Sequence, residues 1–578
     1  MTLPAMPSAP NYAARASNWW PAVCSVAIGC AYLAVSWHIS GPAYLEDEIG
    51  YLANAAFFPG YRIDAASSFH AGYSLFIAPA FLFSDPGVVW KGVLTINAVL
   101  WAANFAMLYK ITRRLLPDTD ERRALVATVV SALYPTWIIS SAYAFATTAF
   151  VAVFLASILA LFLWKRDNAV SILPHSILIG YLYWVHPTGA AVAFASVLVV
   201  ALVCWQRRDA RAILLHFVCV VALVVAYQRG VHPWIVGAMT PSGYAPQSHY
   251  PTLASALETL ITAHGFTVAS LLLFGQFAYF IVASFGIAFV GLIFCMRAAL
   301  NPRADVHRSA PQGNARAVYL LIGAAPIAVM ALASISFFQN ETFEGNYWIY
   351  GRYLDGAVLP VLVIGFAVFR ADIRLVVLSI YLVAIGLLLD LMVPSGGEHN
   401  IVNTVSFWPQ YLSANAGFFV WMLIAAFAVA GVARYGRRAA IALMVLSFPL
   451  SVYRQTVWHD WLVTNFSMPS PLVQTIRNTV RPGSCVGVNP VLPPGATFFQ
   501  SERYHLNSFY LFDYAYRRMS PAEWREQCDG PYLSYDVSGL NEIAGIQAVA
   551  RDPESGLLLF KKQDALNFGS PPSRVAGQ

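Results

Sequence analysis

Three consecutive carboxylates, Glu46-Asp47-Glu48, follow the first long apolar segment of the chain. Only 11% of the residues are charged, so a cluster of this kind at the end of an apolar segment is conspicuous. Acidic side chains at a membrane boundary are costly to keep dehydrated, and they are often functional. A carboxylate in that place is suited to remove a proton from a reacting hydroxyl group. The competing interpretation is that the carboxylates only solvate the start of a surface helix, whose dipole they also complement.

The segment around the cluster has one apolar and one polar face when it is drawn as a helix. The apolar positions are Leu45, Ile49, Leu52 and Ala56, and the polar positions are Asp47, Tyr51 and Asn54. This spacing predicts an interfacial helix that lies along the membrane with its apolar face down. Such a helix holds Asp47 at the water–lipid boundary, where we expect Asp47 to be a catalytic base and Tyr51 to bind substrate.

Arg352 is the second residue whose type and position indicate chemistry. It is nearly alone as an arginine in the short loops of its side of the membrane. A guanidinium fork matches the oxygens of a phosphate group, so we expect Arg352 to bind phosphate and Tyr350 to line the same site. The alternative is a cation that rests beside Tyr350 and Tyr353 or pairs with Asp355.

Two histidines emerge on the same side as these residues. His70 starts the segment His70-Ala71-Gly72-Tyr73, and His186 lies where one predicted helix turns back into the next. His70 is a candidate for binding substrate, and His186 is a candidate for binding the donor phosphate. For both, the alternative of an ordinary interfacial polar residue stays open.

The composition requires a membrane to surround these residues. The chain of 578 residues is 58% hydrophobic and has a mean hydropathy of +0.58, which excludes an ordinary soluble protein. Lipid forces backbone polar groups into helices or a closed barrel, and long unbroken apolar runs favour helices. We expect an all-α polytopic membrane domain over residues 19–456, preceded by a cytoplasmic leader at 1–18. About thirteen transmembrane helices of roughly 20 residues fit the sequence at 19–38, 88–111, 124–141, 143–164, 170–185, 188–205, 211–228, 267–296, 317–337, 354–370, 374–393, 416–434 and 438–456.

The arginines indicate how these helices are oriented. They gather in the loops after every second predicted helix, near residues 113–123, 166, 207–211, 297–316, 370–374 and 434–438. Positive residues mark the cytoplasmic side, so the net charge of +6 reflects topology and does not indicate nucleic-acid binding. We therefore expect a bacterial inner-membrane protein whose first loop, active site and C-terminal domain are periplasmic.

Residues 457–578 lose the membrane composition and predict a small periplasmic α/β domain. Cys485 and Cys528 are its only cysteines, and in an oxidising compartment we expect them to form a disulfide. The sequence has no Cys/His cluster with metal-ligand spacing and no phosphate-binding glycine motif. We therefore expect neither a metal nor a cofactor.

Four short motifs, in this order, resemble the C-type (GT-C fold) membrane glycosyltransferases. That family includes protein O-mannosyltransferases, the lipid A aminoarabinose transferase and bacterial arabinofuranosyltransferases. The motifs are the acidic pair Asp47-Glu48, His70-Ala71-Gly72-Tyr73 with Ala78-Pro79, Ala132-Leu133-Tyr134-Pro135, and Tyr350-Gly351-Arg352-Tyr353. The chain departs from the family pattern in having Thr147-Thr148 where many relatives carry a glutamate. It also has His186-Pro187 where an arginine before proline is frequent.

The resemblance implies transfer of a sugar from a polyprenyl-phosphate carrier to an acceptor hydroxyl, with inversion. Asp47 is then the general base, and Glu48 orients a substrate or tunes Asp47 through like charge. Arg352 and His186 stabilise the departing phosphate. The implied partners are the lipid-linked sugar, membrane lipids and an acceptor that is a glycan, a lipid or a protein. Overall similarity favours an arabinofuranose-type pentose donor and an envelope glycan or pilin acceptor.

Two other functions remain open. The first is a transporter or flippase for a lipid or amphiphile, which commonly shows inverted repeats and broken helices at the bilayer midplane. No clear internal repeat is present, and the polar residues gather at one membrane face, which favours an enzyme. The second is an oligosaccharide ligase that uses a diphosphate carrier.

Overall fold

A computed structural model describes residues 19–562 of the protein apart from gaps. The gaps are residues 44, 66–67, 166–167, 208, 240–257, 259, 301–313, 338–347, 371, 393–405, 413–415, 463, 465–468, 490, 492–504, 537–539, 541–544 and 554. The predicted leader at 1–18 and the side chain of Glu46 lie outside the described part.

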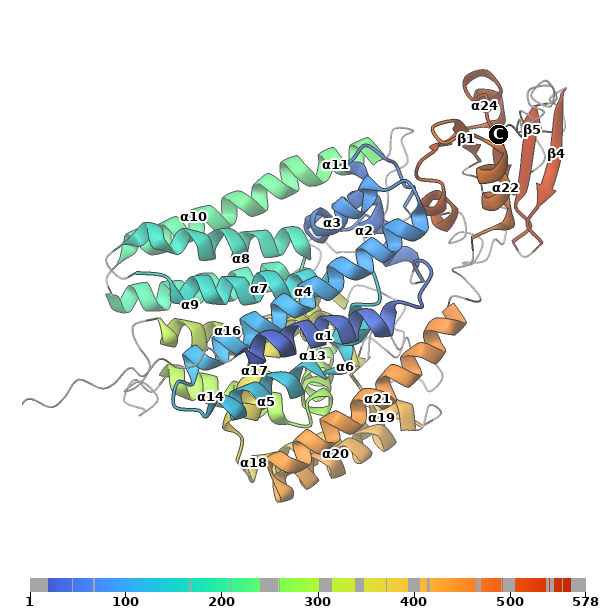
Figure 1. Cartoon of the computed structure of the whole chain (residues 1–578). Helices are drawn as coiled ribbons and strands as arrows, with labels where there is room; N and C mark the ends of the chain where they lie inside the picture. The colour runs from blue at the N-terminus through green and yellow to red at the C-terminus, as the bar shows by residue number, and fades with distance from the viewer. Residues whose placement is uncertain are drawn as a thin grey trace, which may run out of the picture.

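The described chain is a bundle of helices with a small sheet domain at one end (Figure 1). The first half of the bundle contains α1 (Trp20–Ser36), α4 (Pro86–Leu115), α5 (Glu121–Ala132), α6 (Pro135–Ser140), α7 (Thr147–Phe162), α8 (Leu173–Val185), α9 (Gly189–Arg207) and α10 (Ala210–Ala226). The second half contains α13 (Ala263–Ala283), α14 (Ile287–Leu300), α16 (Ala315–Phe337), α17 (Arg352–Val368), α18 (Arg374–Met392), α20 (Phe418–Tyr435) and α21 (Arg437–Leu462). Short helices at the end nearest the sheet domain include α2 (Leu45–Phe57), α3 (Gly72–Ile77), α11 (His232–Met239) and α19 (Pro409–Leu412).

The helices have the length and composition of membrane spans. Eight of the described helices are long and apolar enough to cross a membrane, and five shorter apolar helices accompany them. The predicted all-α polytopic domain is thereby confirmed, and so is the small C-terminal sheet domain. The arginine-rich ends of α5, α14 and α17 meet at one end of the bundle, which we expect to be cytoplasmic.

Two predicted spans are interrupted in the structure. The span predicted at 124–141 is divided into α5 and α6, because Pro135 has no backbone N–H to continue the first helix. The span predicted at 267–296 is divided into α13 and α14 at Phe285 and Gly286, whose φ angles are 52° and 78°. Left-handed backbone of this kind ends a helix, so apolar periodicity alone gave one element where there are two.

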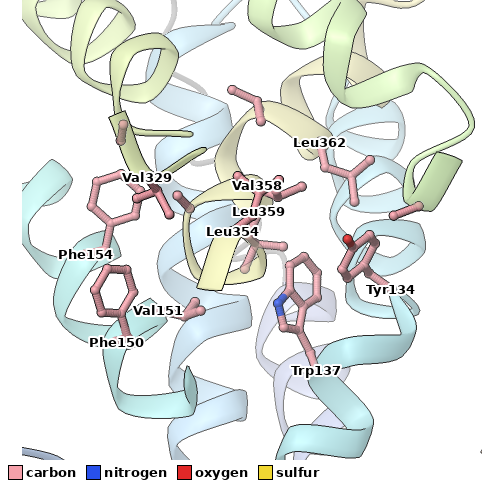
Figure 2. Close-up of a cluster of buried hydrophobic side chains, with 14 of the residues drawn as sticks. Tyr134, Trp137, Phe150, Val151, Phe154, Val329, Leu354, Val358, Leu359 and Leu362 are labelled. Atoms are coloured by element: carbon pink, nitrogen blue, oxygen red, sulfur yellow. The ribbon is translucent and has the colours of Figure 1, made fainter. Parts of the chain in front are cut away.

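Helix α17 runs through the centre of the bundle. All of its residues from Leu354 to Ala367 are buried, as expected for a helix that is apolar on every face. Figure 2 shows Leu354 and Val358 between Phe150 of α7 and Trp137 of α6. A helix packed on all sides is a rigid support, and Arg352 is its first residue.

The C-terminal domain is built on a five-stranded sheet. Its strand order is β2-β1-β3-β5-β4, formed by β1 (Cys485–Val488), β2 (Ala515–Arg518), β3 (Tyr532–Ser534), β4 (Ile546–Arg551) and β5 (Leu558–Lys562). Strand β1 is parallel to β2 and β3, whereas β5 is antiparallel to β3 and β4. Helices α22 (Pro471–Thr479) and α24 (Pro521–Gln527) complete the domain. A disulfide joins Cys485 to Cys528, with Cα atoms 5.4 Å apart.

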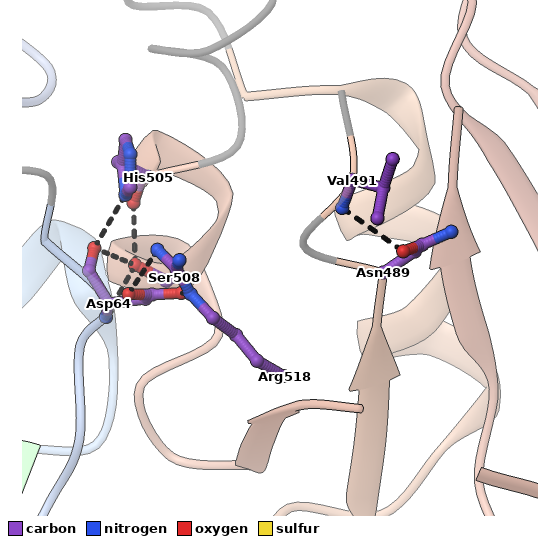
Figure 3. Close-up of polar contacts among 6 residues, drawn as sticks. All are labelled: Asp64, Asn489, Val491, His505, Ser508 and Arg518. Carbon is purple, nitrogen blue, oxygen red and sulfur yellow. Dashed lines mark hydrogen bonds and ion pairs between the residues drawn. The ribbon is translucent and has the colours of Figure 1, made fainter. Parts of the chain in front are cut away.

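The C-terminal domain is fastened to the first loop of the bundle (Figure 3). Arg518 of β2 forms an ion pair with Asp64, whose Oδ1 lies 2.7 Å from Nη2 of the arginine. Ser508 accepts a hydrogen bond from the amide of Asp64 and donates one to its carbonyl, each at 3.0 Å. Since Asp64 follows α2, the domain is fixed to the same loop that carries Asp47.

Candidate active site

The carboxylate of Asp47 and the guanidinium of Arg352 form an ion pair. Asp47 lies in the first turn of α2, so this contact joins the short loop helix to the central helix α17. The Arg352 side chain is 9% exposed and that of Asp47 is 17% exposed. Two charges so far removed from water depend on each other for compensation. The sequence predicted both residues on one side of the membrane, and the structure brings them into contact.

The start of α17 is held in place by aromatic rings. The guanidinium carbon of Arg352 lies 3.9 Å from the ring centroid of Phe145, a cation–π contact that fixes the plane of the fork. Gly351 precedes it, and a Cβ there would collide with the ring of Tyr279. The glycine of the Tyr350-Gly351-Arg352 sequence therefore lets this turn press against α13. Tyr350 packs on Tyr353, with ring centroids 4.8 Å apart.

A small cavity opens beside the ion pair. It combines the guanidinium of Arg352 with the hydroxyl groups of Tyr51, Thr147 and Thr188. Its lining residues are Tyr51, Ala146, Thr147, Phe150, His186, Thr188, Arg352, Tyr353 and Gly356. One cation surrounded by hydrogen-bond donors is an arrangement suited to an anion such as a phosphate ester.

His186 lies in the wall of the cavity with a defined orientation. Its Nδ1 accepts a hydrogen bond from the amide of Thr188 at 3.2 Å and lies 2.8 Å from the hydroxyl of the same residue. Burial and the nearby charges of His70 and Arg352 hold the pKa of His186 well below 6.5. A neutral imidazole that accepts at Nδ1 carries its proton on Nε2, so His186 offers one hydrogen-bond donor.

Tyr51 lies one turn after Asp47 on α2 and lines the cavity with its side chain buried. Burial raises the pKa of Tyr51 well above 10, and the negative charge of Asp47 raises it further. The phenol therefore keeps its proton and acts as a donor. The predicted polar face of this helix thus contributes both Asp47 and Tyr51 to the same site.

Glu48 has a different environment from its neighbour. Its carboxylate is fully buried, and its two oxygens accept backbone amide hydrogen bonds from Ala43 and Ala144, each at 2.7 Å. These contacts tie the start of α2 to the loop before α7, which also carries Phe145. The geometry gives Glu48 a positioning function, and its predicted direct action on a substrate stays a prediction.

We expect Glu48→Gln to lower the free energy of unfolding by about 2 kcal/mol, because one amide N–H then faces an NH₂ group in place of an oxygen. Thermal unfolding of the purified protein in detergent measures the change. Glu526→Gln, at an exposed position in the C-terminal domain, is the control and should leave the unfolding midpoint unchanged. An unaltered midpoint in Glu48→Gln would show that the two amides do not depend on the carboxylate.

Comparison with solved structures defines the architecture around this site. The crystal structure of ArnT from Cupriavidus metallidurans bound to undecaprenyl phosphate aligns over 94% of this chain and 98% of ArnT, with a TM-score of 0.51 and 16% identity. Its apo state aligns over 93% and 97%, again with a TM-score of 0.51 and 16% identity. The chain has the GT-C fold.

Arabinosyltransferase EmbB from Mycobacterium smegmatis, another protein with the GT-C fold, is more distant. It gives a TM-score of 0.38 and 14% identity over 79% of this chain and 43% of EmbB. No family model and no curated protein matches the sequence. The similarity to ArnT thus extends over nearly the whole of both chains at an identity that carries the fold alone.

Two other predicted site residues, His70 and Tyr350, lie outside the lining of the cavity. His70 contacts the carbonyl oxygen of Tyr183 on α8 through Nδ1, and its ring packs against Tyr227 at a centroid distance of 4.9 Å. Tyr350 packs on Tyr353, which does line the cavity. Substrate contacts of His70 and Tyr350 stay predictions, whereas their observed contacts position the first loop and the start of α17.

Acid should destabilise the protein partly through His70. Burial lowers the pKa of His70 from 6.5 to about 3, so the unfolded chain binds a proton between these values that the folded chain does not. Stability from this residue is complete above pH 6.5 and is lost as the pH falls. The slope of the unfolding free energy against pH reports the number of protons taken up on unfolding. Between pH 6 and 4, we expect His70→Gln to take up about one proton fewer than the unmodified protein.

Unfolding midpoints measured at several pH values test the effect of His70. His38→Gln, which removes one imidazole at an exposed position, is the control. A slope that stays the same in His70→Gln would mean that the imidazole is protonated in the folded state.

The sequence did not reveal the role of Asp355, which joins the helices that surround the site. Asp355, one turn after Arg352, is buried and accepts hydrogen bonds from the hydroxyls of Tyr134 and Thr136, each at 2.6 Å, and of Tyr279 at 3.0 Å. The sequence indicates Asp355 only as an ion-pair partner for Arg352. A carboxylate inside an apolar helix is the signal that marks such a residue. Asp355 ties α6 and α13 to α17.

The described residues contain no group of three or more His, Cys, Asp or Glu side chains able to hold a metal ion. Within that part of the chain, the polar groups around the cavity are Arg352, one imidazole and several hydroxyls. These groups bind anions through hydrogen bonds and charge.

Proposed function

We propose that the protein is a membrane-embedded glycosyltransferase that transfers a sugar from a polyprenyl-phosphate carrier to an acceptor hydroxyl. The observation that carries this proposal is the ion pair of Asp47 and Arg352 at the edge of a donor-lined cavity. One site then holds a carboxylate able to take a proton and a guanidinium able to hold a phosphate. The GT-C fold, which ArnT has when bound to undecaprenyl phosphate, supports the same conclusion.

The reaction needs one bond to form and one to break. The acceptor oxygen attacks the anomeric carbon of the sugar, and the bond from that carbon to the phosphate oxygen breaks with inversion. Asp47 takes the hydroxyl proton as general base and later releases it to solvent. Polyprenyl phosphate leaves with the electron pair and an additional negative charge.

Arg352, His186 and Tyr51 receive that charge. Arginine has five N–H donors in a fixed fork, so Arg352 can hold Asp47 and a phosphate oxygen at the same time. The neutral imidazole of His186 adds a donor at Nε2, and the protonated phenol of Tyr51 adds another. Donors that are already oriented stabilise the developing charge without a cost of reorganisation during the reaction.

One wall of the cavity bears on the identity of the sugar and the acceptor. Thr147 and His186, the two departures from the family pattern, both line the cavity, so this wall differs in chemistry from that of many relatives. We propose a pentose donor of the arabinofuranose type and an envelope glycan or pilin acceptor on the periplasmic side. We also propose that the C-terminal domain, which is fastened to the first loop through Asp64, takes part in acceptor binding.

A transfer assay with purified protein tests the function. Decaprenyl-phosphate carriers bearing arabinofuranose, aminoarabinose or mannose are incubated with envelope glycans and pilin from the same cells. Release of polyprenyl monophosphate together with a glycosylated acceptor is the expected result. A polyprenyl-diphosphate sugar is offered in a parallel reaction, and transfer from that donor alone, with release of polyprenyl diphosphate, would indicate an oligosaccharide ligase.

Reconstituted vesicles distinguish the enzyme from a flippase. A fluorescent polyprenyl-phosphate sugar is placed in one leaflet, and its movement to the other leaflet is followed with and without acceptor. Movement of the lipid without transfer to any acceptor would contradict the proposal and support transport.

A further inference from the structure

A second, larger cavity lies at the other end of the bundle. Its volume is about 530 Å³, far more than the roughly 30 Å³ that one water molecule occupies. It lies between the loop after α4, the start of α5, the end of α14 and the turn after α17. Helix α17 connects the two sites, since Arg352 is its first residue and Val368 its last. At 1.5 Å per residue, the cavities lie about 24 Å apart along this helix.

Four arginines from three parts of the chain meet at this cavity. They are Arg123, Arg297, Arg370 and Arg374, against two aspartates, Asp118 and Asp372. The surplus is therefore two positive charges. One ion pair among these residues joins Arg374 and Asp372, with Nε 3.3 Å from Oδ1. The cavity thus has more cationic groups than its own carboxylates neutralise.

Arg123 has a buried donor without an acceptor in this cluster. Its Nε is buried, and none of the described groups accepts a hydrogen bond from it. A buried guanidinium N–H without an acceptor is costly. Arg437, at the start of α21, lies close enough for its charge to interact with that of Arg123. Two cations held near each other are relieved by an anion that contacts both.

The remaining walls of the cavity are apolar. They include Val290, Ile293 and Phe294 of α14 and Ala367 and Val368 of α17. These side chains belong to helices that have the composition of membrane spans, so the arginines lie where an apolar surface ends. A ligand with a phosphate at one end and a hydrocarbon chain at the other satisfies both parts of this wall.

We propose that this arginine cavity is a binding site for a lipid phosphate ester, separate from the active site and on the opposite face of the membrane. Its volume accommodates a headgroup and exceeds what inorganic phosphate alone requires. Two sources share the chemistry, namely an anionic glycerophospholipid and a polyprenyl phosphate. The four arginines come from three segments, namely the start of α5, the end of α14 and the turn between α17 and α18, and all of them line one cavity.

Titration of the full-length protein in detergent, followed by native mass spectrometry, tests the proposal. The probes are dioleoyl phosphatidylglycerol, farnesyl phosphate, dioleoyl phosphatidylcholine and inorganic phosphate. We expect the first two to bind more tightly than the zwitterionic lipid and the free anion. A preference for phosphatidylglycerol assigns a glycerophospholipid, and a preference for farnesyl phosphate assigns a polyprenyl carrier. Equal binding of all four probes would overturn the proposal.

The decisive variant is the double substitution Arg297→Gln and Arg370→Gln, at two exposed positions where folding should be unaffected. Each juxtamembrane cation contributes roughly fivefold to binding of an anionic lipid, so the dissociation constant should rise about 25-fold. Arg434→Gln, an exposed arginine at the end of α20 outside the cavity, is the matched control and should bind as the unmodified protein does. The double lysine variant keeps both charges and should restore most of the affinity.

The titration is repeated in Arg352→Gln, so that farnesyl phosphate bound at the active site does not obscure the second site. Loss of lipid binding in the double variant but not in Arg352→Gln supports a separate site. Unchanged binding in the double variant overturns it, whether or not the protein proves to be a glycosyltransferase.

Discussion

Asp47→Asn should reduce the rate of sugar transfer about 1,000-fold, within the 10²–10⁴ range of general base catalysis, while the protein still binds its donor. Asparagine keeps the shape of the side chain and removes its ability to take a proton. It also removes the counter-ion of Arg352, which leaves the guanidinium more available to the donor phosphate. The two quantities are measured separately. The single-turnover rate of transfer should fall, whereas the affinity for the lipid-linked donor should rise or stay unchanged.

A matched control for this substitution lies in the same loop. Asp64 also pairs with an arginine, Arg518, but it fastens the C-terminal domain and lies outside the cavity lining. Asp64→Asn should therefore weaken docking of the domain without the large loss of rate. Transfer at the unmodified rate in Asp47→Asn would remove Asp47 from the role of base. A comparable loss in both variants would mean that any broken ion pair in this loop disturbs the site.

The sequence was informative about the fold wherever a long apolar run coincided with a single helix. Helices α1, α4, α16 and α18 begin and end close to the predicted spans. It was wrong where a local backbone change interrupts an apolar run, as at Phe285 and Gly286. The break lies in the backbone conformation of two residues, and hydrophobic periodicity does not contain that information. The order of strands in the C-terminal sheet was likewise beyond prediction, since pairing is non-local.

For the site, residue types were predicted better than contacts. Asp47, Tyr51, His186 and Arg352 are singled out by the sequence; in the structure the last three line one cavity, and Asp47 pairs with Arg352. Glu48 follows Asp47 directly, yet its carboxylate reaches the amide of Ala144, 96 residues away in the chain. Helical geometry separates neighbours by about 100°, so adjacent carboxylates reach different environments. Only the packed structure shows that Asp47 pairs with Arg352 whereas Glu48 holds the backbone.

Arg352→Gln should reduce transfer at least about 100-fold, through weaker donor binding and a slower chemical step together. Glutamine is neutral and cannot form the charged bidentate contact that arginine makes with phosphate. The substitution also leaves the carboxylate of Asp47 without its partner in a site where it is only 17% exposed. We expect about 2 kcal/mol of stability to be lost, between the values for exposed and for fully buried pairs.

Three further variants separate the electrostatic role of Arg352 from its structural one. Arg352→Lys retains the charge without the fork and should recover about tenfold in rate, because lysine acts on phosphate as a point charge. The double variant Asp47→Asn with Arg352→Gln has no unpaired charge, so its unfolding midpoint should return toward that of the unmodified protein while transfer stays absent. Arg518→Gln, which breaks the ion pair with Asp64, is the control for loss of an arginine pair outside the cavity.

If the double variant regained transfer together with stability, the pair would be a structural clamp and the phosphate would be held elsewhere. Recovery of stability alone assigns the chemistry to these two charges, since only they differ between a folded, active protein and a folded, inactive one.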